Sequence, residues 1–375
     1  MSATNHPVDP GGLLEYSVVY TDRALNHMSQ AFQGVMRDIS AILCSAYAAD
    51  AVAVVPGGGT YAMEAVARQF ADDAPCLILR NGWFSFRWSQ ILDMGRITTK
   101  ASVLKARRTA EHAQASWTPA PLPEVLDAIR AQRPAVVFAP HVETASGIVL
   151  PDDYLQAVGA ATREVGGLFV LDCIASGALW VDMRATGVDV LISAPQKGWS
   201  GHSCAGLVMF GERAVARLAG TTSTSFACDL KKWRQIMESY EAGGHAYHAT
   251  MPTDALRRVR DAMRETETFG FGLARERQVQ LGRKVRDMVA ARGFPSVAAA
   301  GFEAPGVVVS HTTDAEIQSA KKFVAQGFQL AAGVPLQCDE GADFRSFRIG
   351  LFGLDKLADI DGTVTRLTGA FERLS

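Results

Sequence analysis

Short and almost continuously apolar runs recur along the first half of the chain, separated by stretches in which apolar residues follow helical spacing. Such runs are typical of strands in a parallel sheet that is covered on both faces. The expected strands are Ala51–Val55, Cys76–Leu79, Ala135–Ala139, Leu168–Leu171, Val188–Ile192 and Leu207–Phe210. The expected helices between them are Ala62–Phe70, Pro123–Gln132 and Asp153–Val165. This repetition predicts a wound α/β sheet whose ligands bind at the carboxyl ends of the strands.

The pattern changes after about Tyr247. Pro252 stands where a helix would begin, and helix-forming sequence continues to Arg292 with an interruption at Gly270–Gly272. Beyond it we expect strands at Val307–Ser310 and Phe347–Gly350, which alternate with helices at Asp314–Val324 and Lys356–Leu374. This part predicts a smaller α+β domain that begins with a long connecting helix. We expect an N-terminal segment over residues 1–20, a large domain over 21–252 and the smaller domain over 253–375.

Composition narrows the class of protein. Of the 375 residues 48% are hydrophobic and 20% are charged, as in ordinary globular chains. With 37 basic and 39 acidic residues the net charge is −2, which gives no general attraction to nucleic acid or to an anionic membrane. No run approaches the roughly 20 apolar residues that span a bilayer. The polar start Met1–Gly12 and six cysteines without a C-x-x-C pair indicate a cytoplasmic protein with free thiols.

A glycine-rich turn, Gly57-Gly58-Gly59-Thr60, connects the first expected strand to the helix that follows it. Glycine lets the backbone approach a ligand closely, and the exposed N–H groups of a helix start favour an anion such as phosphate. The run equally fits a tight strand-to-helix turn with no ligand. It contains neither the G-K-[ST] of a P-loop nor a G-x-G-x-x-G dinucleotide motif.

Two charged residues follow expected buried strands. Asp172 ends one of them, where a carboxylate is costly without a partner, although an aspartate that caps the next segment is an ordinary alternative. Lys197 follows the next strand within Ser193-Ala194-Pro195-Gln196-Lys197-Gly198. A desolvated lysine has a lowered pKa and can form a Schiff base with a carbonyl group. Taken alone, Lys197 would be interpreted as a surface lysine.

The three features together are more specific than any one of them. Neighbouring parallel strands that end near Asp172 and Lys197 would place both groups at one edge of the sheet, beside the glycine turn. Pyridoxal phosphate (PLP) requires this combination. Its phosphate binds at a helix start, its aldehyde condenses with a lysine, and an aspartate keeps its pyridine nitrogen protonated.

From about Ala51 onward the chain resembles the class V PLP-dependent aminotransferases of fold type I, in the alanine–glyoxylate and serine–pyruvate aminotransferase group. The motifs that support the resemblance are Gly58–Ala65, Asn81–Arg87, His141–Gly147, Asp172, Gln196–Lys197, Tyr247–Thr250 and Phe347–Gly350. The resemblance implies an α/β fold with a large domain, whose mostly parallel sheet lies between helices, and a smaller C-terminal α+β domain.

The resemblance also implies a role for each motif residue. Lys197 would form the Schiff base and move the proton, and Asp172 would hold the pyridine nitrogen. Phe84 would stack on the ring and Thr144 would bond to the cofactor near its ring oxygen. Arg348 would bind the carboxylate of the substrate. The phosphate would be held by Gly58, Gly59, Thr60 and Gln196, and by Tyr247 and Thr250 of the neighbouring subunit of a homodimer.

The implied activity is transfer of an amino group from a small amino acid to a 2-oxo acid such as glyoxylate or pyruvate. A PLP-dependent lyase or deaminase and a cysteine desulfurase that uses Cys338 are alternatives on the same fold, and a non-catalytic PLP-binding module is a further one. The segment Leu13–Tyr20 replaces the Gly-Pro-Gly-Pro stretch that is usual in the family. The resemblance therefore does not extend to the choice of substrate.

Overall fold

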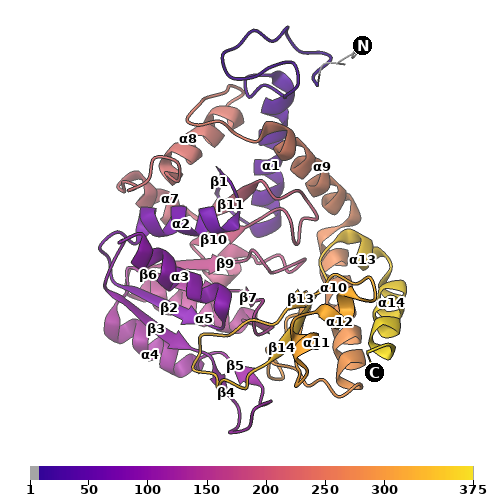
Figure 1. Cartoon of the computed structure of the whole chain (residues 1–375). Helices are drawn as coiled ribbons and strands as arrows, with labels where there is room; N and C mark the ends of the chain where they lie inside the picture. Colours follow the sequence, from indigo (N-terminus) through magenta and orange to yellow (C-terminus); the bar gives the residue numbers. More distant parts are fainter. Residues whose placement is uncertain (1–7, 375) are drawn as a thin grey trace.

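A seven-stranded sheet forms the centre of the larger part of the molecule (Figure 1). The structure is a computed structural model and describes residues 8–374, so Met1–Pro7 of the expected N-terminal segment lie outside the described residues. In spatial order the strands are β1 (Ala51–Pro56), β11 (Ala205–Phe210), β10 (Val190–Ser193), β9 (Leu168–Asp172), β6 (Val136–Pro140), β2 (Cys76–Arg80) and β3 (Ala101–Lys105).

Only β11 runs against its neighbours, and every other pair in this sheet is parallel. The six strands expected from apolar runs are all present, and the prediction of a mostly parallel sheet between helices is confirmed. The edge strand β3 was not predicted, because Ala101–Lys105 is partly exposed and lacks a continuous apolar run.

Helices cover this sheet on both faces, which is why its inner strands are buried along almost their whole length. Those of the larger part are α1 (Gln30–Tyr47), α2 (Gly59–Phe70), α3 (Trp83–Met94), α4 (Leu122–Gln132), α5 (Asp152–Glu164), α6 (Met183–Thr186), α7 (Glu212–Ala219) and α8 (Leu230–Glu241). The helices α2 and α3 pack side by side, as do α4 and α5. Short strand pairs join β4 (Arg107–Arg108) to β5 (Trp117–Thr118) and β7 (Val142–Glu143) to β8 (Ile148–Val149).

The C-terminal part lies beside the larger part (Figure 1). The helices α9 (Thr253–Phe269) and α10 (Phe271–Ala290) lead into it and are separated at Gly270, whose φ of +94° breaks the helix where an interruption was expected. A three-stranded antiparallel sheet of β12 (Val307–His311), β14 (Ser346–Gly350) and β13 (Ala331–Ala332) packs with α10. The strand β14 positions Arg348.

Two helices expected in this part are each divided in the structure. The stretch Asp314–Val324 forms α11 (Ala315–Gln318) and α12 (Lys321–Val324), because Ala320 adopts a left-handed conformation with φ of 63°. The stretch Lys356–Leu374 forms α13 (Leu354–Ala358) and α14 (Ile360–Glu372), which are separated at Asp359, whose φ of −128° and ψ of 73° are not helical. Apolar spacing alone does not reveal such single-residue breaks.

Within residues 8–374 no helix is both long enough and apolar enough to cross a membrane. All six cysteines are unpaired, as expected from their spacing.

Candidate active site

Asp172 lies at the carboxyl end of β9, directly beside the neighbouring parallel strand β10, where it pairs in register with Ile192. Its side chain is buried, and its Oδ1 accepts a hydrogen bond from the backbone N–H of Ile174 at 2.9 Å. In the described part of the chain no cation lies within ion-pair distance of this carboxylate. Burial raises the pKa of Asp172 to about 6, against the opposing effects of the Ile174 N–H and the Lys197 charge. The aspartate is thus a buried acid with one oxygen left for a ligand.

Lys197 follows β10 at the same edge of the sheet. Among the described residues its amine has neither a hydrogen-bond acceptor nor a carboxylate within 4.0 Å. Burial lowers the pKa of Lys197, and the nearby Asp172 charge opposes that effect. An amine with a lowered pKa and no partner is a nucleophile that can attach a carbonyl compound.

The loop that holds Lys197 is anchored by the tryptophan two residues later. Trp199 is fully buried, and its ring lies 4.6 Å from that of Trp180 and 6.1 Å from that of Tyr47. A Cβ on Gly198 would clash with the carbonyl oxygen of Gly177, so the loop passes this neighbour only with glycine. Packing on both sides of the loop therefore fixes the backbone from which Lys197 extends.

The glycine turn connects β1 to α2 at this edge. Gly57 has a φ of +120°, and Gly58 is the extended residue before α2. A Cβ on Gly58 would meet nothing within 4 Å, so the backbone is open there, whereas one on Gly59 would clash with the side chain of Ile174. Ile174 is also the residue whose N–H binds Asp172. The start of α2 therefore packs directly on the loop of the aspartate.

Phe84 stands near the beginning of α3, which a buried glutamate caps. Glu143 accepts hydrogen bonds from the backbone N–H groups of Phe84, Ser85 and Ala145 and from the Ser85 hydroxyl, at 2.7–3.2 Å. A carboxylate at a helix start satisfies N–H groups that have no partner within the helix. Glu143 thereby fixes the backbone of Phe84.

Three cationic side chains converge on the Phe84 ring. Its centroid lies 4.7 Å from Arg87 Cζ, 5.5 Å from Arg348 Cζ and 6.0 Å from Lys197 Nζ. Arg348 Nε donates to the carbonyl oxygen of Ala332 at 2.8 Å, which leaves the rest of its guanidinium available. Neither arginine has a carboxylate within 4.0 Å among the described residues. The space around this ring is therefore suited to an anionic ligand.

The other predicted residues fall into two groups. Thr60 at the start of α2, buried Thr144 and exposed Gln196 belong to the segments that surround Asp172 and Lys197. Tyr247 and Thr250 instead hydrogen-bond to each other at 3.0 Å in the exposed loop between α8 and α9. No described contact joins these two to the other predicted residues of this chain.

These residues fit PLP. Asp172 has a free buried oxygen for a pyridinium N–H, and Lys197 has a free amine for the aldehyde. Gly58 leaves open space at a helix start where a phosphate can approach. Phe84 offers a ring for stacking between these groups.

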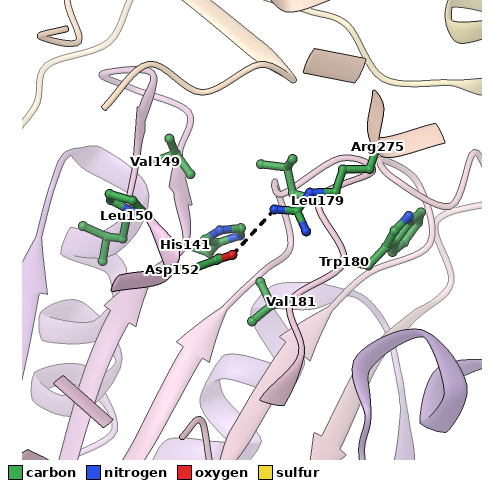
Figure 2. A pocket seen from close by; sticks show the side chains of 9 residues that line it. His141, Val149, Leu150, Asp152, Leu179, Trp180, Val181 and Arg275 are labelled. Atoms are coloured by element: carbon green, nitrogen blue, oxygen red, sulfur yellow. Dashed lines mark ion pairs between the residues drawn. The ribbon is translucent and has the colours of Figure 1, made fainter. Parts of the chain in front are cut away.

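A cavity of about 270 Å³ lies near the carboxyl end of β6 (Figure 2). Arg275 and Asp152 form an ion pair of 3.6 Å across it. The His141 ring beside them binds the Ser176 hydroxyl through Nδ1 at 2.7 Å, and burial lowers the pKa of His141 to about 3. The histidine that lines this cavity is therefore neutral and hydrogen-bonded, and the arginine is paired with a carboxylate.

No protein-family model matches the chain. A 2-aminoethylphosphonate–pyruvate transaminase of Burkholderia lata is 27% identical over 371 residues, which cover 94% of each chain. A transaminase of the same name from Paraburkholderia phymatum is 28% identical over 360 residues, 92% of this chain and 90% of that one. A protein named as a soluble hydrogenase small subunit from a Synechococcus species is 24% identical and covers 88% and 83%.

Solved structures agree with the sequence relatives. Alanine–glyoxylate aminotransferase from a Nostoc species superposes with a TM-score of 0.79 at 22% identity, covering 93% of this chain and 89% of that one. Ureidoglycine–glyoxylate aminotransferase of Bacillus subtilis gives 0.77 at 20% identity, covering 96% and 87%. The fold is that of the PLP-dependent aminotransferases, fold type I. The predicted resemblance to class V is confirmed, as are the predictions of a transaminase enzyme and of PLP as its cofactor.

Arg87 lies near the candidate site, although the sequence analysis assigned it no role. Arg87 approaches both Phe84 and Thr60. In the sequence it is one arginine among many, and its approach to Thr60 depends on how α2 packs against α3. No periodicity or motif spacing reports that packing.

Proposed function

We propose that this chain is an aminotransferase that moves an amino group from a small amino donor to a 2-oxo acid such as pyruvate or glyoxylate. The observation on which the proposal depends is the position of Lys197, whose unpaired amine lies at the same sheet edge as the buried carboxylate of Asp172. The names of the relatives, which pair an amino donor with pyruvate or glyoxylate, support the choice of acceptor.

When bound, PLP supplies an aldehyde for the amino group and a ring that accepts electrons from the α-carbon. Lys197 would hold the cofactor through its amine, and the same amine would accept and return the proton of the α-carbon as general base and general acid. Its lowered pKa supports this role, because burial favours the neutral form of the amine, which is the form that accepts a proton.

Asp172 would accept a hydrogen bond from the pyridine nitrogen and would keep that nitrogen protonated. The supporting feature is its burial, which is costly for the carboxylate in the absence of a cation. Phe84 would stack on the ring, Thr144 would bind near the ring oxygen, and the phosphate would be held at the start of α2 by Gly58, Gly59, Thr60 and Gln196. These placements follow from the resemblance together with the positions of the residues.

Arg348 binds the carboxylate of the acid substrate in a two-pronged manner. Its Nε is held by the Ala332 carbonyl oxygen, so the guanidinium is already oriented before the substrate arrives. Because burial lowers the pKa of Arg348 and no carboxylate of the described chain pairs with it, an incoming carboxylate compensates its charge.

We further propose a homodimer in which Tyr247 and Thr250 of one subunit reach the phosphate of the other. In the described chain these two hydroxyl groups bind only each other, and the Tyr247 side chain is 53% exposed. The large apolar side chains of Leu13, Tyr16 and Phe226 are exposed in this chain, which supports contact with a second protein subunit. The cytoplasmic location is proposed on the unpaired cysteines.

The desulfurase alternative requires a mobile and ionisable cysteine. Cys338 is buried, and its Sγ lies 3.4 Å from the Arg80 carbonyl oxygen. Burial raises the pKa of Cys338 to about 12, so the thiolate is scarce. This environment favours transamination over desulfuration.

The proposal is tested with a panel of amino donors, including alanine, serine and 2-aminoethylphosphonate, against pyruvate and glyoxylate. Loss of the yellow cofactor band with a donor, and its return with an oxo acid, are expected. Lys197→Ala should retain cofactor while turnover falls by roughly 10²–10⁴-fold or more. Lys100→Ala is the matched control, because Lys100 is a surface residue paired with Asp73. Full turnover in Lys197→Ala, or ammonia release without any oxo acid, would reject the proposal.

A further inference from the structure

A groove of about 420 Å³ is lined by residues of α2 and α3. Thr60, at the start of α2, belongs both to the wall of this groove and to the predicted phosphate-binding turn. The groove is lined by Thr60, Glu64, Arg68, Arg87, Gln90, Ile91, Met94 and Gly95. It therefore contains two arginines close to the place where a phosphate would bind.

The two arginines differ in how their charge is compensated. Arg68 contacts Glu64 through Nε at 2.8 Å and Nη2 at 2.7 Å, and it donates to Thr224 at 3.0 Å. Arg87 has no carboxylate within 4.0 Å in the described part of the chain. Its hydrogen bond goes to a neutral partner, from Nη1 to Thr60 Oγ1 at 3.3 Å. Arg68 is thus neutralised by its neighbour, and Arg87 remains an uncompensated cation.

Arg87 is also oriented toward the site. Its guanidinium lies over the Phe84 ring at 4.7 Å from the centroid, an arrangement that stabilises a cation without neutralising it. Its positive charge acts on both Asp172 and Lys197. It opposes the rise that burial causes in the pKa of Asp172, and it adds to the fall that burial causes in the pKa of Lys197. The geometry agrees, because the Arg87 guanidinium and the Lys197 amine both lie near the Phe84 ring, 4.7 Å and 6.0 Å from its centroid.

A cofactor phosphate carries a charge of about −1.5 to −2 near neutral pH. The groups proposed to hold it within this chain are the start of α2, the Thr60 hydroxyl and the Gln196 amide, none of which has a full positive charge. The helix start contributes roughly half an elementary charge. Arg348 is assigned to the substrate carboxylate, so among the residues of this chain proposed around the phosphate only Arg87 would supply a full positive charge.

We infer that Arg87 is a cofactor-binding residue whose guanidinium pairs with the phosphate of PLP beside Thr60. The inference rests on the proposed function, because it assumes that the phosphate lies at the start of α2. It extends that function by adding a charged group to a phosphate site otherwise built from neutral donors. Arg87 becomes the residue that distinguishes a phosphorylated cofactor from an unphosphorylated one.

The test compares PLP with pyridoxal, which has the same ring and aldehyde but no phosphate. Cofactor-free full-length protein is titrated with each compound, and the imine absorbance gives the dissociation constant. Arg87→Met should raise the dissociation constant for PLP by roughly 10- to 100-fold, as expected for a lost charge-assisted hydrogen bond. Its dissociation constant for pyridoxal should stay within about twofold of the wild-type value.

Arg87→Lys should recover part of the affinity for PLP, and Arg68→Met, in the same groove, should leave both affinities unchanged. If Arg87→Met does not fold, as judged by circular dichroism, Arg87→Gln is compared in the same way. Equal weakening for both compounds would overturn the inference, since Arg87 would then act through Phe84, and so would no weakening for either. A wild-type protein that formed an imine with neither compound would instead reject the proposed function.

Discussion

Arg348 Cζ lies 5.5 Å from the centroid of the Phe84 ring. The arginine is on β14 of the small sheet and the phenylalanine is at the start of α3, which packs on the central sheet. This contact brings the group proposed to bind the substrate next to the group proposed to stack on the cofactor. The candidate site therefore combines a side chain from the small sheet with a side chain from α3.

Arg348→Gln should weaken binding of acid substrates. The variant loses a charge-assisted, two-pronged contact worth roughly 1.5–3 kcal/mol, so KM for the oxo acid should rise by about 10- to 100-fold. Because Arg348 is not proposed to hold the cofactor, the absorbance of bound PLP should stay as in the wild type. Steady-state kinetics with pyruvate would measure the change. An unaltered KM would show that another residue binds the carboxylate.

Asp172 should make the stability of the cofactor-free protein depend on pH. Its pKa is raised from 3.8 to about 6, so between these values the folded chain retains a proton that the unfolded chain releases. The free energy of unfolding should therefore fall as the pH rises from about 4 to about 6, by at most about 3 kcal/mol. Asp172→Asn removes this cost, and it should exceed the wild type in stability above pH 6.

Thermal unfolding of both proteins at a series of pH values provides the measurement. The stability difference should disappear below about pH 4, where the aspartate is protonated in both states. The same variant should bind PLP more weakly, because an amide does not hold the pyridine nitrogen in its protonated form. A stability difference that grew toward low pH would contradict this account of Asp172.

Glu143→Gln should destabilise the fold through the start of α3. The carboxylate accepts four hydrogen bonds in a fully buried position, and an amide would place its own N–H groups against some of those donors. A loss of about 1–3 kcal/mol in the free energy of unfolding is expected from urea titration. Glu111→Gln is the control, since that side chain is exposed and its ion pair with Arg108 is long at 3.5 Å. Equal stability of the two variants would show that the cap is dispensable.

The strands of the central sheet could be predicted from sequence because each is an unbroken apolar run buried on both faces. The proximity of Asp172 and Lys197 follows from their position at the ends of adjacent parallel strands. The breaks at Ala320 and Asp359 could not be predicted, because they depend on single-residue backbone conformations. The uncompensated charge of Arg87 could not be predicted either. It results from which carboxylates the packing of α2 and α3 places near each arginine.

Cys338→Ala should leave transaminase turnover within about twofold of the wild type. The thiol is buried between segments and its pKa is raised to about 12, so it is not available as a nucleophile. Assays of sulfide release from cysteine with the wild-type protein should remain at background. Sulfide production that disappeared in Cys338→Ala would establish the desulfurase alternative.

Mixed dimers should show whether Tyr247 and Thr250 serve the neighbouring subunit. Lys197→Ala subunits lack the amine but keep both hydroxyl groups, and subunits carrying Tyr247→Phe with Thr250→Ala have the reverse defect. In a two-fold symmetric dimer that shares its sites, one site of each mixed dimer combines the intact parts of both subunits. Random reassembly of equal amounts should then restore about a quarter of the wild-type active sites. If the hydroxyl groups instead acted within their own chain, every site would contain a defect, and the mixture would have only the average activity of the two separate variants.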